Sequence, residues 1–305
     1  MALLSVQNIS VSFGERDVLR NISFDIAKGD RVGLIGSNGC GKTTLFNAIT
    51  GTLEVTEGAV VRASGTVIGC VEQHACADSA RTVYDELLTV FAFLEQTEKE
   101  LEEIHRKVEL TDGSVPEYIE KQSELTEFYQ ANGGLTYRAR AHSCLKGLGF
   151  SPAEEELPVS ALSGGQRTKL SLGKLLLSEP DLMLLDEPTN HLDTVSVEWL
   201  EDFLSKFGGS LMVISHDRYF LDKVTTRTME ITVGRLYAGK GAYTEYMKLK
   251  AQRLESDRRE YEKGMLEIKR IEKMIEQQKT FSMERNYITI ASKEKQIERI
   301  RASLP

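Results

Sequence analysis

The chain has 305 residues, 41% of them hydrophobic and 28% charged, and a formal net charge of −8. This composition is typical of a folded globular protein with a sizeable core and excludes a disordered chain. The acidic balance argues against a general nucleic-acid binder, and no stretch approaches the roughly 18 uncharged apolar residues of a membrane span. Because the N-terminus has neither a basic flank nor a long apolar run, we expect a cytoplasmic protein without a membrane domain.

The first half of the chain has the patterns of an α/β fold. Polar and apolar residues alternate over 3–26, which predicts half-buried antiparallel strands. A short strand at 31–35 then enters a glycine-rich loop, and a helix starts near Lys42, as in half of a β-α-β unit. Two apolar runs at 182–185 and 211–214 flank a helical pattern and suit parallel strands covered on both faces. We therefore expect an α/β domain with an antiparallel β subdomain over residues 1–245.

Two helical segments interrupt and follow this domain. Residues 82–130 have helical apolar spacing with a break at 112–116, which predicts an inserted helical hairpin. Residues 81–130 hold 13 acidic and 5 basic side chains, and a plain solvated face is the alternative interpretation of that charge. From residue 246 apolar residues recur every seventh position, so we expect a charged, incomplete coiled-coil linker over 246–305. From Lys248 onward it carries 15 Lys and Arg against 10 Asp and Glu.

The strongest chemical motif is the glycine-rich loop from Gly36 to Thr43, which fits the pattern GxxxxGK[ST] between a strand and a helix. Glycines let backbone N–H groups face phosphates, and the helix N-terminus adds the positive end of its dipole. Lys42 then neutralises phosphate oxygens, and Thr43 offers a hydroxyl to Mg²⁺. The residues expected to contact ATP here are Ser37, Asn38, Gly39, Cys40, Gly41, Lys42, Thr43 and Thr44.

An acidic pair, Asp186 and Glu187, follows the apolar run at 182–185. A carboxylate at the end of a buried strand costs several kcal/mol without a counter-ion, so a Mg²⁺ partner explains Asp186. Glu187 is then the general base or water-orienting group, with a helix-capping acid as the alternative. By themselves these features fit any P-loop NTPase, including a helicase or a small-molecule kinase.

Further motifs narrow the choice. Residues 162–167, Leu-Ser-Gly-Gly-Gln-Arg, are followed by a helix and resemble the signature of the ATP-binding cassette. Residues 188–193 and 214–217 resemble its D-loop and switch histidine, and Gln73 matches its Q-loop. These matches cover residues 3–247 in the order that the family has. The resemblance implies a P-loop cassette fold with ATPase activity.

The resemblance also implies roles for individual residues. Phe13 would stack on adenine, with a plain core aromatic as the alternative. Gln73 would sense Mg²⁺ and the attacking water, and His216 would bond the γ-phosphate. The residues that would contact a nucleotide held by another cassette are Ser163, Gly164, Gly165, Gln166 and Asp193. Hydrolysis therefore implies a second cassette, either on the same polypeptide or in a homodimer.

Three features together resemble the ABC-F proteins: the sequence of residues 186–193, the inserted hairpin and the charged linker. ABC-F proteins have two cassettes and no membrane domain, and they act on ribosomes. The charge split adds a hypothesis to this resemblance: the basic linker suits rRNA phosphate, and the acidic insertion, which the family calls the arm, would prefer a basic ribosomal protein. The alternatives are the nucleotide-binding subunit of a membrane transporter and a DNA-repair cassette of the coiled-coil type. Whether the protein serves translation or antibiotic resistance stays open.

Overall fold

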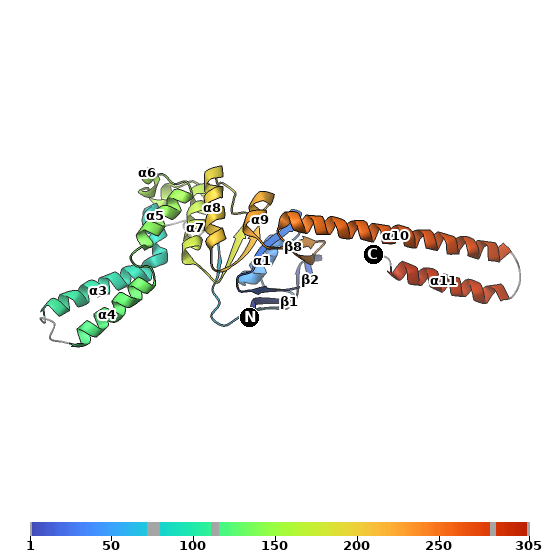
Figure 1. Cartoon of the computed structure of the whole chain (residues 1–305), viewed down its shortest axis with the longest axis horizontal. Helices are drawn as coiled ribbons and strands as arrows, with labels where there is room; N and C mark the ends of the chain where they lie inside the picture. The colour runs from blue at the N-terminus through green and yellow to red at the C-terminus, as the bar shows by residue number, and fades with distance from the viewer. Residues whose placement is uncertain (1, 72–79, 111–115, 281–284, 304–305) are drawn as a thin grey trace. The chain divides into compact units, whose positions relative to one another are not determined.

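The computed structural model describes residues 2–71, 80–110, 116–280 and 285–303 (Figure 1). The chain divides into two compact units, Met1–Tyr243 and Thr244–Pro305. Within the described ranges no helix is both long and apolar enough to cross a membrane.

The described strands of the first unit form two sheets. An antiparallel sheet has the order β2-β1-β4, and a six-stranded sheet has the order β5-β6-β7-β3-β8-β9. In the larger sheet β5, β6, β7, β3 and β8 are parallel and β9 is antiparallel to β8. The bounds are β1 Ala2–Phe13, β2 Arg16–Ala27, β3 Arg31–Gly36, β4 Glu57–Arg62, β5 Ile68–Cys70, β6 Leu182–Asp186, β7 Ser210–Ile214, β8 Arg227–Thr232 and β9 Arg235–Lys240.

These sheets confirm the predicted fold class and explain the two hydropathy patterns. Along β1, side chains on one face are buried, among them Leu4 and Val6, and the opposite face is open. In β7 all five residues are buried because helices cover the parallel sheet on both faces. Helix α1 (Lys42–Thr50) contributes Leu45 and Ile49 to the core that the two sheets share.

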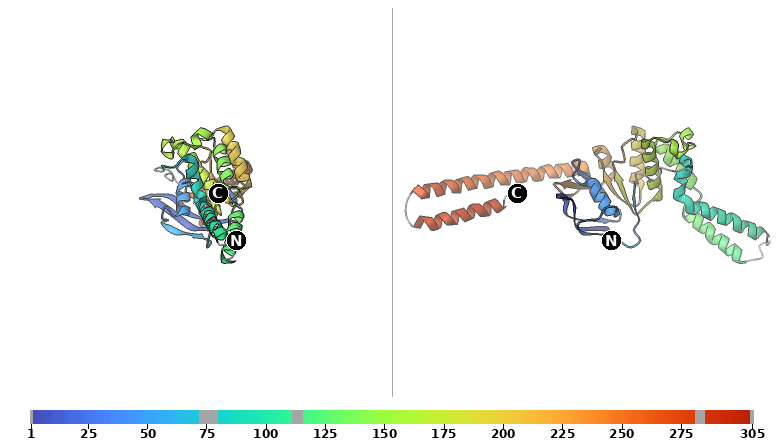
Figure 2. Two further views of the ribbon diagram at one scale, coloured as in Figure 1. Left: turned by 90° about the vertical axis from the view of Figure 1, so that its left-hand side faces the viewer. Right: turned by 180° about the vertical axis from the view of Figure 1, so that it is seen from behind.

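Helices build the remainder of the first unit. α3 (Ala92–Leu110) and α4 (Pro116–Ala131) lie side by side as an antiparallel pair within the predicted insertion (Figure 2). α2 packs against α5 and α7. The other bounds are α2 Val83–Leu88, η1 Thr89–Phe91, α5 Tyr137–Gly147, α6 Pro152–Glu155, η2 Val159–Ala161, α7 Gly164–Ser178, α8 Thr194–Lys206 and α9 Arg218–Val224.

The second unit is a hairpin of α10 (Tyr243–Thr280) and α11 (Arg285–Ser303) (Figure 1). Its small core holds Ile268, Ile271, Ile275 and Ile297, and Arg301 pairs with Glu272 at 3.3 Å. The earlier heptad positions Leu254 and Tyr261 are 54% and 48% exposed. The heptad is therefore packed only along the part of α10 that contacts α11.

Candidate functional site

The glycine-rich loop connects β3 to α1, and its shape depends on glycine. Gly41, at the N-terminus of α1, has φ 105°, and a Cβ there would lie 2.7 Å from a side-chain carbon of Leu19. No other residue type fits that space and that backbone conformation. Lys42 folds back over the loop, where its Nζ donates to the carbonyl oxygens of Gly36 at 2.9 Å and Ser37 at 3.1 Å. The loop therefore encloses its own cation at the helix N-terminus, the arrangement of a phosphate site.

Two oxygen groups meet beside the loop. Thr43, in the first turn of α1, donates its hydroxyl to Asp186 Oδ2 at 2.8 Å. Asp186 is the last residue of β6, so the carboxyl edge of the sheet brings the two side chains together. The sequence placed both among the magnesium ligands, and the structure brings them into contact.

Glu187 lies next to this pair in a constrained backbone conformation. Its φ is 49°, a region that non-glycine residues rarely adopt, and its N–H donates to the carbonyl oxygen of Ile214 at 2.8 Å. Its Oε2 accepts from the backbone N–H of His216 at 3.2 Å, and Oε1 lies 3.5 Å from His216 Nε2. Within the described residues Oε1 is buried and has no hydrogen-bond partner. One oxygen is thus held by a hydrogen bond, while the other is buried beside His216 Nε2 without one.

These groups line one cavity of about 400 Å³. Its walls come from the β subdomain, the loop, the end of β6 and the end of β7. The lining residues are Arg16, Val18, Asn38, Gly39, Gly41, Lys42, Thr43, Thr44, Asp186, Glu187, Ile214 and His216. The sequence reasoning missed Arg16 and Val18, which lie at the start of β2, where Arg16 pairs with Phe13 across the hairpin.

Some predicted nucleotide contacts lie at the margin of this cavity or outside it. Ser37 and Cys40 belong to the loop but do not line the cavity, and Cys40 packs against the core. Phe13 is 54% exposed and pairs across the β1-β2 hairpin with Arg16, which does line it. The stacking role of Phe13 stays a prediction. Gln73 lies outside the described residues.

The signature residues form a separate exposed surface at the start of α7. Ser163 is the N-cap of α7, and Gly164 and Gly165 form its first turn. Asp193 caps α8, and the hydrogen bonds that its carboxylate accepts from Ser196 hold its pKa below the ordinary value. Neither the signature residues nor Asp193 line the cavity that Lys42 and Glu187 share. Their contact with a nucleotide bound elsewhere stays a prediction.

The donor set of the cavity fits Mg²⁺ bound together with phosphate. Mg²⁺ prefers oxygen ligands and is commonly held by one or two protein groups plus substrate phosphates and water. Thr43 and Asp186 supply two such oxygens in contact. Across the described ranges no group of three or more His, Cys, Asp or Glu could hold a metal by itself. A metal here would therefore depend on the nucleotide for further ligands.

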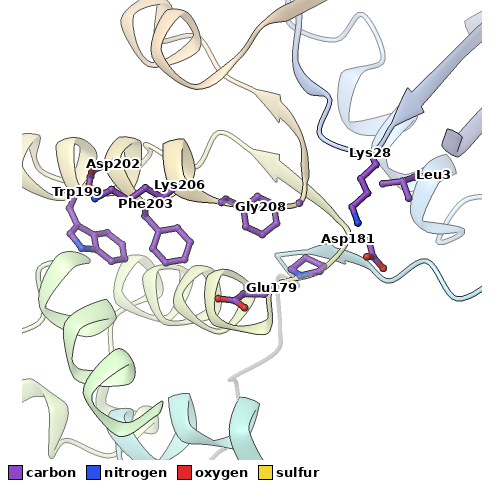
Figure 3. Close-up of a pocket in the computed structure, with 12 residues that line it drawn as sticks. Leu3, Lys28, Glu179, Asp181, Trp199, Asp202, Phe203, Lys206 and Gly208 are labelled. Atoms are coloured by element: carbon purple, nitrogen blue, oxygen red, sulfur yellow. Dashed lines mark hydrogen bonds and ion pairs between the residues drawn. The ribbon is translucent and has the colours of Figure 1, made fainter. Parts of the chain in front are cut away.

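A larger cavity of about 620 Å³ lies at the opposite edge of the parallel sheet (Figure 3). Trp199 and Phe203 of α8 lie along one side, and Lys28 and Asp181 lie toward its other end. Asp181 precedes β6, so this cavity is at the amino ends of the strands, whereas α/β sheets bind ligands at the carboxyl ends. It holds none of the predicted site residues, and we assign the chemistry to the smaller cavity.

Two family models match most of the chain. The family described as ABC transporter matches residues 19–190, and an extension family of the same description matches residues 229–304. Among solved structures, the ATP-binding cassette MJ0796, a dimer bound to ADP and Pi, superposes with a TM-score of 0.54 at 21% identity. That match covers 78% of this chain and 98% of the cassette. At this identity the likeness concerns the fold.

Three relatives are more similar in sequence. The ATP-binding protein YdiF of Bacillus subtilis is 38% identical over 90% of this chain and 43% of its own length. The energy-dependent translational throttle protein EttA of Mycobacterium tuberculosis is 33% identical over 83% and 44%. The tylosin resistance ATP-binding protein TlrC of Streptomyces fradiae is 33% identical over 90% and 50%. The chain spans about half the length of these relatives or less.

Proposed function

This chain belongs to the ABC transporter family of ATP-binding cassettes and carries the linker typical of ABC-F proteins, and from that premise we propose that it hydrolyses Mg-ATP to act on the ribosome. The cassette binds ATP. The hydrolytic step, the metal and the partner belong to the proposal. One observation carries the hydrolytic step, namely that the P-loop lysine, the Thr43–Asp186 pair and the Glu187–His216 pair share one cavity.

The geometry supports a division of labour in that cavity. Backbone N–H groups of the loop and Lys42 would hold the phosphates, and the dipole of α1 adds to their positive field. Thr43 and Asp186 would hold Mg²⁺, which neutralises phosphate charge when bound. Glu187 Oε1 has no hydrogen-bond partner among the described residues, so this oxygen would orient the attacking water and take its proton. His216 fixes the other oxygen through its N–H and would present its ring to the γ-phosphate.

A complete site in this proposal needs two cassettes. Ser163, Gly165 and Asp193 are exposed or partly exposed and lie apart from the chain's own cavity, which supports contact in trans. The second cassette would come from the same polypeptide or from a second copy of this chain.

Removing the base tests the ATPase proposal. The Glu187→Gln variant should keep its ATP affinity and lose about 10²- to 10⁴-fold in turnover, the scale of one catalytic proton-transfer group. Glu198→Gln is the matched control, because Glu198 is an exposed carboxylate of α8 away from the cavity. The proposal fails if Glu187→Gln hydrolyses ATP as fast as the control does. Turnover is measured as released phosphate, and affinity with a fluorescent ATP analogue.

The ribosomal part of the proposal is supported by the relatives and by charge. One relative is named for throttling translation and another for resistance to tylosin. The linker carries a net excess of 5 basic residues, which suits rRNA phosphate, whereas the arm of residues 82–130 would contact a basic ribosomal protein. Two functions fit this proposal: that of a translation factor, and the protection of ribosomes from antibiotics.

The arm contact can be tested on α4. Its acids Glu117, Glu120, Glu124 and Glu127 are exposed and take part in no described ion pair, whereas Glu98 is engaged at the arm base. Reversing two charges in Glu120→Lys/Glu124→Lys should weaken ribosome binding and leave ATP affinity unchanged. The control Glu54→Lys/Glu57→Lys makes the same charge change on exposed residues outside the arm. Equal ribosome binding by both double variants would contradict the proposed contact of the arm with the ribosome. Binding to a membrane partner instead would favour a transporter subunit.

A further inference from the structure

A short helix just before the signature contacts it through one carboxylate. Helix α6, Pro152–Glu155, is followed by the η2 turn, and Ser163 of the signature then caps α7. Glu154 Oε1 accepts a hydrogen bond from Gln166 Nε2 at 2.7 Å. Glu154 thus connects α6 to the third residue of the signature helix.

Glu154 is itself held in one position. Its Oε2 accepts from both the backbone N–H and the hydroxyl of Ser151, at 2.8 and 2.7 Å. These bonds hold the pKa of the Glu154 carboxyl below its ordinary value, so the group is ionised near neutral pH. An ionised carboxylate only accepts hydrogen bonds. Its Oε1 can therefore face only the NH₂ end of the Gln166 amide.

The orientation of the Gln166 amide determines which hydrogen bonds form at the start of α7. With its NH₂ end on Glu154, Gln166 turns its Oε1 toward Ser163, where it accepts from the backbone N–H at 3.0 Å and from the hydroxyl at 2.9 Å. The Ser163 hydroxyl accepts in turn from the Gln166 N–H at 3.3 Å. This is a reciprocal capping box, and the reverse amide orientation would set two donors against each other.

The box leaves a defined pair of donors open. A helix gives its first N–H groups no internal partner, and the capping box uses those of Ser163 and Gln166. The N–H groups of Gly164 and Gly165 remain as the donors of the first turn. Neither glycine has a side chain that could cover them, and the helix dipole adds a positive field at the same point.

We propose that Glu154 is a positioning residue for ATP hydrolysis, which orients Gln166 and thereby presents the Gly164 and Gly165 N–H groups to the terminal phosphate of a nucleotide held by a second cassette. This inference rests on the proposed function and adds to it a residue outside the signature. Glu154 does not line the cavity of Lys42 and Glu187, and it acts through Gln166.

The first test needs no nucleotide. In Glu154→Ala the Gln166 amide loses its anchor, so the Ser163 and Gln166 N–H groups should exchange with deuterium about fivefold faster, the equivalent of one ordinary hydrogen bond. Glu156→Ala is the control, since Glu156 is an exposed neighbour on the same segment. Exchange is followed on peptides spanning residues 160–168. Unchanged exchange in Glu154→Ala would overturn the inference.

The second test measures the reaction in the full chain. Glu154→Ala should lower kcat at least about tenfold, as misplaced groups commonly do, with the affinity for ATP at its own P-loop unchanged. In the Gln166→Ala background the additional loss from Glu154→Ala should vanish, because Glu154 acts through Gln166. Full, additive losses in the double variant would overturn the inference. A parent chain without ATPase activity would count against the proposed function, and the exchange test would still decide the role of Glu154.

Discussion

Removing the carboxylate of Glu98 should destabilise the root of the arm. Glu98 in α3 accepts two hydrogen bonds from Arg138, at 2.7 and 2.6 Å, and one from Tyr137 at 3.0 Å. A further short bond comes from Tyr129 in α4. One side chain therefore connects both arm helices to α5.

The cost of Glu98→Ala follows from the exposure of its partners. Tyr137 is fully buried, so its hydroxyl would lose its acceptor at a cost of about 1–3 kcal/mol. The Arg138 side chain is 53% exposed and would regain water, so the ion pair adds at most about 1 kcal/mol. We expect a loss of about 2–3 kcal/mol, or a Tm lower by about 5–10 °C for a unit of this size.

The pH dependence of that loss provides a second check. The hydrogen bonds from Arg138, opposed by burial, hold the pKa of Glu98 below its ordinary 4.5. A lowered folded-state pKa stabilises the fold above the unfolded-state pKa, and the stabilisation is lost as the pH falls through the folded-state value. The Tm difference between parent and variant should stay constant from about pH 6 to 8 and narrow on acidification below about 4.5.

Differential scanning fluorimetry across this pH range measures both effects. Glu102→Ala is the control, since the Glu102 side chain is 71% exposed and lies 3.9 Å from Arg106, and it should leave the Tm within about 1 °C. If Glu98→Ala has the same Tm as the control, the hydrogen bonds of Glu98 do not stabilise the root of the arm as proposed.

Three further experiments test other parts of the structure. Lys174→Met removes the lysine that lies 2.6 Å from the buried Glu86 carboxylate, which keeps the more exposed Arg81 as a partner. Urea denaturation should therefore show a free energy of unfolding lower by about 2 kcal/mol, less than for a fully unpaired charge. A loss below about 0.5 kcal/mol would contradict this. Gly41→Ala should reduce ATP affinity more than about tenfold and Gly39→Ala less, because a Cβ meets nothing within 4 Å at Gly39 but would clash with Leu19 at Gly41; equal affinities of the two variants would contradict this. Burial raises the pKa of the Cys144 thiol to about 12, so iodoacetamide at pH 8 should modify Cys144 only after unfolding, as followed on the peptide that contains it. Rapid labelling of Cys144 itself in the folded chain would refute its burial.

Local patterns were enough to predict the nucleotide loop and the sheets. The loop was predictable because glycine spacing and its lysine act over a few residues, and β6 and β7 because buried parallel strands are apolar throughout. Asp186 was predicted as a ligand from its place at a strand end; the structure shows its contact with Thr43, and the metal role stays a prediction.

Contacts between distant segments could not be predicted in the same way. Glu98 was one acid in an acidic stretch, and its partner Arg138 lies 40 residues away. Arg16 and Val18 enter the cavity only because the β subdomain packs beside the loop. Glu154 stands 12 residues before Gln166, in a helix of 4 residues that has no periodicity to detect. These residues depend on tertiary packing, which one sequence does not reveal.

The most direct test of the account is co-sedimentation of the Glu187→Gln chain with bacterial ribosomes in ATP and in ADP, run also with a second cassette fused to its linker. Blocking hydrolysis should trap the ATP-bound state, so we predict pelleting in ATP and little in ADP, and none for a Lys42→Ala variant that cannot hold the phosphates. Absence of the Glu187→Gln chain from the ribosomal pellet in ATP, with and without the second cassette and despite measured ATP binding, would contradict the ribosomal function.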